Sequence, residues 1–204
     1  MPTCRLLSAA AVLAATTFGA GAEEAPNVAQ FTKRMFAGSP SGAARYACFV
    51  RRYDAAHLAR HPQQKVSRMK LLVSAEKVPE DEALNYSFRL GLNFRHRPGD
   101  FDSSGACGHA QVSETSEGRV QIGCSIDCDG GGLDVSLSHR TDAAIIRLST
   151  HVRIWEKNNQ PDEEAGDALL AGTDDRIFRL DRVGNDECRS LATDRKELAA
   201  LRRK

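Results

Sequence analysis

Hydrophobic and polar residues alternate strictly over residues 84–95, LNYSFRLGLNFR. Leu, Tyr and Phe occupy the even positions of this stretch, and Asn, Ser, Arg and Gly occupy the odd positions. Successive side chains of a β-strand point to opposite faces of the sheet. A period of two over twelve residues therefore predicts a strand with one buried face and one face in water.

The same period recurs along most of the chain. It predicts eight strands, near residues 45–51, 66–75, 84–95, 104–112, 119–128, 132–139, 143–156 and 176–182. Short turns separate several of these runs, so neighbouring strands are expected to pair antiparallel in chain order. A meander of this length must close on itself or fold over to bury its apolar face. The predicted fold class is all-β, a closed or partly open β-barrel, with a β-sandwich as the alternative.

Two turns set the expected register of this meander. A two-residue turn at Gly130 and Gly131, within DGGG, pairs Cys128 with Leu133 and keeps the apolar residues of both strands on one face. The HRTD turn, residues 139–142, makes the next connection and pairs Leu137 with Ala144.

Helical patterns and loops flank the strands. Residues 28–37 predict a short helix, residues 157–175 an acidic loop, and residues 186–204 a C-terminal helix with a thin apolar stripe. The predicted organisation is a signal peptide (1–22), an N-terminal helix and linker (23–44), a barrel-like domain (45–185) and the C-terminal helix (186–204).

The first 22 residues have the pattern of a secretory signal peptide. Arg5 precedes an apolar run over residues 6–18, and the small residues Ala20 and Ala22 precede Glu23. The run is too short to span a membrane, so no membrane span is expected. We expect cleavage after Ala22 and location in the periplasm or outside the cell.

Charge argues against a nucleic-acid partner. Without Arg5 the remaining chain keeps 27 of its 28 Lys and Arg residues, against 27 Asp and Glu residues. Its formal net charge is therefore zero, whereas nucleic-acid-binding proteins and membrane-surface proteins need a basic excess.

Five cysteines follow the predicted cleavage site: Cys48, Cys107, Cys124, Cys128 and Cys188. In an oxidising compartment they are disulfide candidates, and no C-x-x-C motif is present. A turn between residues 115 and 116 places Cys107 opposite Cys124, but it also turns His109 inward. A one-residue shift would keep His109 outside and separate the two sulfurs. We favour the bridge, because a reduced pair is not expected in this compartment.

The second predicted bridge joins Cys128 to Cys188. It rests on elimination and on the expectation that Cys128 points inward at the end of its strand. Cys48–Cys188 is the alternative, since both residues can lie in strands that meet when a barrel closes. With the favoured Cys128–Cys188 bridge, Cys48 is the unpaired thiol, so the protein is expected to be a monomer or a Cys48-linked dimer.

The stretch RRYDAAHLARHP, residues 51–62, carries the strongest candidate for chemistry. Asp54, His57 and His61 have the helical spacing of metal ligands. However, no Glu follows His57, and Pro62 disfavours helical geometry at His61. Asp54 can instead cap a short helix over residues 55–60. We therefore predict a capped connector and no cofactor. The alternative is a metal-binding protein or an enzyme that uses these three residues.

Two weaker patterns are also interpreted structurally. Asp127, Asp129 and Asp134 lie in DCDGGGLD, which lacks the remaining ligands of a calcium loop and predicts a glycine turn. A catalytic pair of Cys107 and His109 is not favoured. The sequence has no nucleophile elbow, P-loop or dinucleotide-binding fingerprint. No catalytic residue is therefore predicted.

Three blocks, CFVRRYDAAHLARHPQQKV, CSIDCDGGG and DDRIFRLDR, resemble an uncharacterised group of small exported bacterial proteins. They cover about a fifth of the chain. The resemblance implies a shared fold but no activity, and it assigns no catalytic residue.

The functional prediction is a non-enzymatic exported protein that binds a small ligand or a protein partner. The first alternative is a structural envelope-associated protein without a ligand, its interior filled by Leu84, Phe88, Leu92 and Phe94. The second is the metal protein or enzyme described above.

Overall fold

A computed structural model of the chain describes residues 26–37, 39, 42, 44–77, 84–108, 113–114, 120–157 and 167–202. Its strands are β1 (Ala44–Arg52), β2 (Val66–Lys77), β3 (Leu84–Phe94), β4 (Phe101–Cys107), β5 (Ser113–Glu114), β6 (Val120–Ser125), β7 (Gly131–Leu137), β8 (Ala143–Glu156), β9 (Asp167–Leu170) and β10 (Ile177–Val183). The helices are α1 (Pro26–Met35), α2 (Ala55–Arg60), the 3₁₀ helix η2 (Asn185–Leu191) and α3 (Arg195–Leu201).

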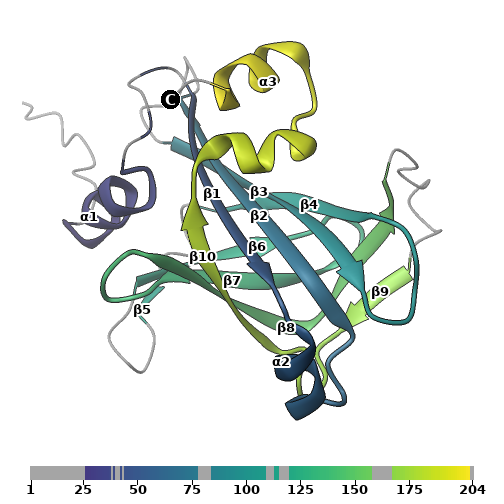
Figure 1. The fold of residues 1–204 in the computed structure, drawn as a ribbon. Helices are drawn as coiled ribbons and strands as arrows, with labels where there is room; N and C mark the ends of the chain where they lie inside the picture. Colours follow the sequence, from purple (N-terminus) through teal and green to yellow (C-terminus); the bar gives the residue numbers. More distant parts are fainter. Residues whose placement is uncertain are drawn as a thin grey trace, which may run out of the picture.

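The strands form one antiparallel sheet that closes into a ring. Hydrogen bonding follows the order β10-β1-β2-β3-β4-β6-β7-β8-β9, and β8 also pairs with β10. Figure 1 shows the strands wrapping around a common interior. The prediction of an all-β meander that closes on itself is confirmed, and each of the eight predicted strands has a counterpart. Residues 109–112 of the predicted fourth strand lie outside the described residues. A short strand, β9, lies in the predicted acidic loop and pairs with β8.

Strand alternation places one set of side chains inside the ring. The largest fully buried side chains include Phe49, Phe88, Phe101, Phe178 and Met69, which come from five different strands. They fill the interior along the described strands with aromatic and aliphatic groups, as the alternating pattern predicts.

Helix α1 packs against the same interior. Phe31, Met35 and the adjacent Phe36 are buried in the core, and the short helix predicted over residues 28–37 is present. Arg182 of β10 donates hydrogen bonds to the carbonyl oxygens of Arg34 and Met35, at 3.1 and 2.9 Å. These bonds satisfy carbonyl groups that the end of a helix leaves without partners, and they attach α1 to the sheet.

The register predicted for the β6–β7 hairpin is wrong by four residues. Cys124, and not Cys128, pairs with Leu133, because β6 ends at Ser125 and the turn occupies the next residues. Gly131 is therefore part of β7 and has φ +80°. A Cβ atom at this position would lie 2.0 Å from the carbonyl oxygen of His151 in β8, so the glycine permits close strand approach. The register predicted for the next turn, Leu137 opposite Ala144, is confirmed.

The C-terminal segment, residues 184–202, forms two short helices where one was predicted. Asp194 interrupts the pattern and caps α3, accepting a hydrogen bond from the amide of Glu197 at 2.8 Å. The segment lies across the outside of β1, β2 and β3 (Figure 1). It covers a second, outer hydrophobic cluster that includes Tyr46, Leu72 and Leu191.

The structure contains two disulfides, and one differs from the prediction. Cys107–Cys124 joins facing residues of β4 and β6, as predicted. The second bridge is Cys48–Cys188, and not Cys128–Cys188. Cys48 lies on the outer face of β1 opposite Val183, the last residue of β10. The chain then turns back as η2, which carries Cys188 over Cys48, with 5.8 Å between their Cα atoms.

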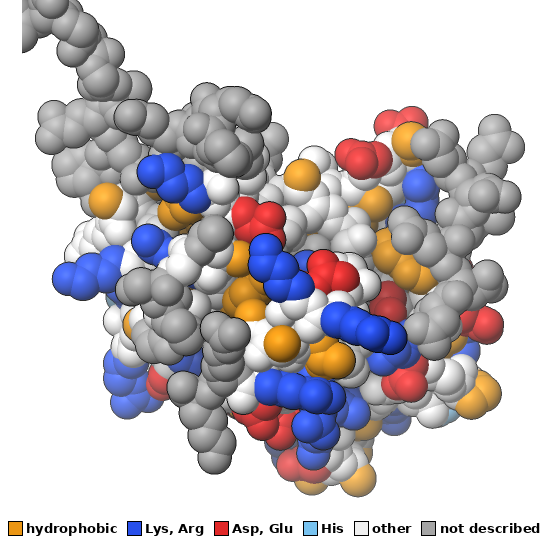
Figure 2. Space-filling view, turned by 90° about the horizontal axis from the view of Figure 1, so that it is seen from above, with side chains coloured by type: hydrophobic (Ala, Val, Ile, Leu, Met, Phe, Trp, Pro, Cys, Tyr) orange, Lys and Arg blue, Asp and Glu red, His pale blue; other side chains and the backbone are white. Residues whose placement is uncertain are grey.

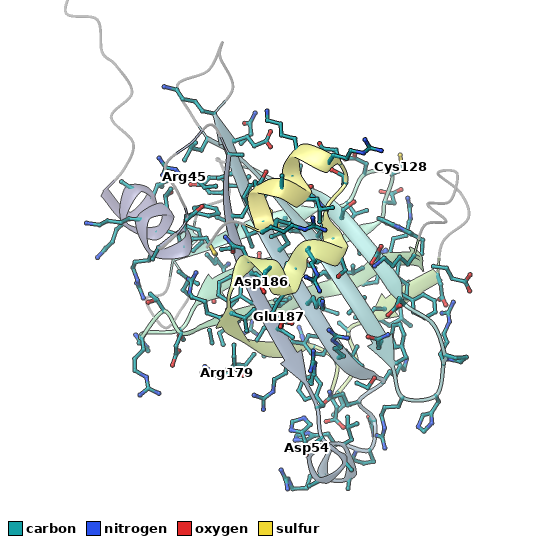
Figure 3. All side chains as sticks on the ribbon, turned by 45° about the horizontal axis from the view of Figure 1, so that its top comes forward. Arg45, Asp54, Cys128, Arg179, Asp186 and Glu187 are labelled. Atoms are coloured by element: carbon teal, nitrogen blue, oxygen red, sulfur yellow. A yellow bond between two sulfur atoms is a disulfide. The ribbon has the colours of Figure 1, made fainter. Side chains whose placement is uncertain are left out.

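The unpaired cysteine is therefore Cys128. It is exposed in the β6–β7 turn, with φ 54°. Figure 3 shows it far from Asp186 and Glu187, which precede Cys188 in η2. Cys48 is buried and bridged, so the Cys48-linked dimer considered from the sequence is wrong. None of the helices in the described ranges is long and apolar enough to cross a membrane.

We expect non-reducing peptide mapping to recover linked peptides containing Cys48–Cys188 and Cys107–Cys124, with one alkylatable thiol at Cys128. Replacing both Cys48 and Cys188 by Ala should lower the free energy of unfolding by about 3 kcal/mol, because the bridge closes a long loop. Cys128→Ser is the matched control and should leave stability within about 0.5 kcal/mol. A linked peptide containing Cys128 in the monomer would contradict this pairing.

Candidate functional site

The predicted role of Asp54 as a helix cap is confirmed. Its carboxylate accepts a hydrogen bond from the amide of His57 at 2.7 Å, and α2 begins at the next residue. The helix ends before Pro62, which cannot continue it. Figure 3 shows Asp54 at one extremity of the molecule.

The two histidines of this connector make specific contacts with their neighbours. The rings of His57 and His61 stack with their centroids 4.3 Å apart. His57 Nε2 lies 3.0 Å from the side-chain oxygen of Gln64, whose amide group donates to the carbonyl oxygen of Val66 at 2.7 Å. His61 Nδ1 lies 3.6 Å from Asp174. These contacts position the connector, and they are not a convergent set of ligands.

The neighbouring Asp175 anchors the chain after α2. It is almost fully buried, and its carboxylate accepts hydrogen bonds from the amides of Lys65 and Val66 at 2.7 and 3.3 Å. Burial raises the pKa of Asp175, and these backbone hydrogen bonds oppose the effect. Two of the blocks noted in the sequence, around residues 48–66 and 174–182, therefore meet at this end of the sheet.

No group of three His, Cys, Asp or Glu side chains within the described ranges could hold a metal ion. Asp127 and Asp129, from the calcium-like stretch, are exposed in the β6–β7 turn. The carbonyl oxygens of this turn accept hydrogen bonds from Arg153, and the Asp129 carbonyl oxygen lies 3.0 Å from His151 Nε2. Asp134 lies in β7 opposite Arg147. His109 lies outside the described residues.

Asp54→Ala should lower the free energy of unfolding by about 1 kcal/mol, because the cap is lost. Asp127→Ala removes an exposed carboxylate without a cap and should change stability by less than about 0.5 kcal/mol. Metal analysis should find no stoichiometric zinc in the wild type, His57→Ala or His61→Ala. Zinc that is present in the wild type and absent from both histidine variants would restore the metal-site interpretation.

A different feature, on the outside of the sheet, has the form of a binding site. Three adjoining hollows of about 450, 440 and 180 Å³ lie along the outer face of β3 and β4. The first two share Arg89, Ser104 and Trp155, and the last two share Asp102 and Lys157. We call the combined feature the outer groove. The middle hollow has the size of small-molecule sites, which occupy about 300–1,000 Å³.

A single cross-strand row forms the floor of the outer groove. Lys70 pairs with Gly91, Gly91 with Asp102, and Asp102 with Trp155, across β2, β3, β4 and β8. Directly opposed residues of neighbouring strands project from the same face. Gly91 contributes no side chain, and Leu191 of η2 packs over it: a Cβ atom at this position would lie 3.1 Å from Leu191 Cδ2.

The C-terminal segment forms one wall of the outer groove. Arg89 of β3 makes a two-pronged ion pair with Glu197 of α3, at 2.5 and 2.7 Å, and donates to the carbonyl oxygen of Leu191 at 2.7 Å. Both charged side chains are largely buried. Lys70 donates a hydrogen bond to Ser190. These bonds hold the wall against the sheet next to the floor residues.

Two charged side chains of the outer groove, Asp102 and Lys157, have no hydrogen-bond partner among the described residues. Among the described residues, Asp102 and Lys157 form no direct ion pair, and neither side chain makes a hydrogen bond. Burial raises the pKa of Asp102, while the positive charge of Lys157 lowers it. A half-buried carboxylate loses hydration without gaining a donor, so a ligand that supplies a donor can bind there.

The surface seen from above carries charges of both signs. Figure 2 shows Lys and Arg side chains interspersed with Asp and Glu, and hydrophobic side chains between them. This mixture gives the face no single-sign field that would attract a polyanion.

Sequence reasoning missed the outer groove. Two signals were present in the pattern. Trp155 is the one tryptophan of the chain, and its position next to inward-facing Ile154 places it on the outer face. Gly91 interrupts the polar side chains of the longest alternating strand. Neither signal alone identifies a groove, because the C-terminal wall depends on the Cys48–Cys188 bridge.

Comparisons of the chain with protein-family models, curated proteins and solved structures found no match. The resemblance to a group of exported bacterial proteins therefore remains a prediction, and the site is interpreted from its geometry.

Glu197→Gln should lower the free energy of unfolding at pH 7 by about 1–3 kcal/mol. Burial alone would raise the pKa of Glu197, but hydrogen bonds from Arg89 and Thr193 outweigh it and lower the pKa. The ionised carboxylate therefore stabilises the fold above the unfolded-state pKa of Glu, about 4.3, and this contribution is lost as pH falls through the lower folded-state pKa.

Urea denaturation at pH 7, 5 and 3 measures this effect. The difference between wild type and Glu197→Gln should shrink at the lowest pH, where the wild-type carboxyl becomes protonated. Glu187→Gln, an exposed carboxylate of η2, is the control and should cost less than about 1 kcal/mol. A pH-independent difference for Glu197→Gln would contradict a stabilising ionised pair.

Proposed function

We propose that the protein is an exported, non-enzymatic binding protein that holds a small ligand in the outer groove. The observation that supports the proposal most strongly is the contrast between the two faces of the sheet. Large aromatic and aliphatic side chains fill the inside, whereas the outside carries a groove with unpartnered polar groups and a partly exposed tryptophan. Binding sites commonly combine an apolar surface with a few polar groups.

The location proposed for this activity is the periplasm or the cell exterior. Residues 1–22 have the signal-peptide pattern, with cleavage proposed after Ala22. The two disulfides are consistent with an oxidising compartment. A binding protein of this kind needs no membrane span and no nucleic-acid-binding surface.

A thermal-shift screen of small molecules from several chemical classes tests groove binding. A ligand at ten times its dissociation constant adds about 1.4 kcal/mol of stability, which corresponds to roughly 3–6 °C in Tm for a chain of this size. At least one class should raise the Tm of the wild type. The shift should disappear in Trp155→Ala, because this variant removes the aromatic side chain from the floor of the groove.

Leu170→Ala is the matched control. Leu170 is a large hydrophobic side chain, 55% exposed, and it does not line the groove. This variant should retain the ligand-induced shift. A screen with no stabilising class, or a shift that survives unchanged in Trp155→Ala, would remove the support for groove binding and favour a structural envelope protein.

A further inference from the structure

We infer that the outer groove binds a neutral oligosaccharide, with Trp155 as a stacking platform and Asp102 and Lys157 as the hydrogen-bonding groups. This inference names the ligand class and rests on the groove binding proposed above.

The position of Trp155 supports a stacking role. It lies near the end of β8 on the outer face, opposite Asp102 of β4, and its side chain is only partly buried. An aromatic ring in such a position combines an apolar face with a polar indole N–H group. The C–H face of a sugar ring can pack on the indole while its hydroxyl groups reach the polar residues beside it.

The polar groups of the groove favour a ligand that donates and accepts at adjacent positions. Asp102 offers only acceptors when ionised, and Lys157 offers only donors. A sugar hydroxyl resembles those of Ser and Thr, with one donor and two acceptor lone pairs. Neighbouring hydroxyls can therefore satisfy both residues at once. A phosphate or carboxylate ligand would meet the Asp102 charge, and a cation would meet Lys157.

Arg89 does not alter this assignment. Its guanidinium lines the middle hollow but is already bonded to Glu197 and to the Leu191 carbonyl oxygen. It therefore has no unmatched charge to attract an anion. Ser104 projects from the same face as Arg89. Its hydroxyl makes no hydrogen bond with the described part of the chain, so it can bond a further sugar hydroxyl.

The dimensions of the outer groove favour more than one sugar ring. The middle hollow of about 440 Å³ continues past Trp155 into the neighbouring hollow of about 450 Å³. An elongated, open groove suits a linear chain, whereas a single amino acid is better held in a closed pocket that surrounds both of its charges. A zwitterionic amino acid or dipeptide is therefore an outcome that the experiment must separate from a saccharide.

Trp155 also provides the measurement. Because it is the one tryptophan of the chain, its emission reports on the groove without background from other tryptophans. Cellotriose, maltotriose and triacetylchitotriose are titrated into the full folded protein. At least one should change the emission saturably, with a dissociation constant of roughly 10 µM to 1 mM. Because the ligand is neutral, binding should change less than twofold between about 50 and 500 mM salt.

Isothermal calorimetry then tests the assigned residues with the trisaccharide that binds best. Asp102→Asn and Trp155→Ala should each weaken binding at least tenfold. Asp134→Asn is the matched control, because Asp134 is another partly buried outward carboxylate of the sheet and does not line the groove. It should bind as the wild type does. Circular dichroism melting of each variant shows that any loss does not reflect unfolding.

Three results would overturn the saccharide assignment. In the first, no trisaccharide binds, but another class of small molecule raises the Tm and Trp155→Ala abolishes that rise; groove binding then stands with a different ligand. Glycylglycine or inorganic phosphate binds through Asp102 or Lys157 with strong salt dependence, which identifies an ionic ligand. A trisaccharide binds equally well to Trp155→Ala and Asp102→Asn, which places the site elsewhere.

Discussion

Closure of the sheet depends on one long strand. β8 is paired with β10 along its first half, with β7 between Ala144 and Val152, and with β9 and β4 near its end. Unpaired edge strands expose backbone groups that must find partners, and β8 supplies those partners on both of its sides. It also carries Ile146, Leu148 and Val152 into the core and Trp155 to the outer face. The filled interior and the outer groove are therefore consequences of the same strand.

Much of the fold could be predicted because the alternating pattern is strong. The period of two identified the eight main strands, and the Asp54 cap followed from one residue and its position before α2. The prediction of the β6–β7 register was wrong because consecutive glycines fit both a tight turn and a strand. Their use in β7 depends on the approach of β8 at His151, which local sequence does not reveal. The prediction of the second disulfide was wrong for the same reason, because it placed Cys128 in a strand, whereas Cys128 lies in a turn.

The outer groove was less predictable because it is assembled from distant segments. Its floor joins residues 70, 91, 102 and 155, and its wall comes from the chain beyond residue 189. The C-terminal pattern predicted a helix but not where that helix would lie. Its position is set by the bridge from Cys188 to Cys48 of β1 and by the ion pair between Glu197 and Arg89 of β3. The chemistry of the site is thus a property of the tertiary structure.

The Cys48–Cys188 bridge, with a sequence separation of 140 residues, constrains the order in which the protein can mature. In a chain that enters an oxidising compartment N-terminus first, Cys48 arrives long before its partner. Cys107, Cys124 and Cys128 all pass while Cys48 is still a thiol, so pairing of cysteines in order of arrival would produce the wrong bridge. Correct maturation therefore requires that Cys48 be protected in the growing sheet, or that a disulfide isomerase correct it by thiol–disulfide exchange.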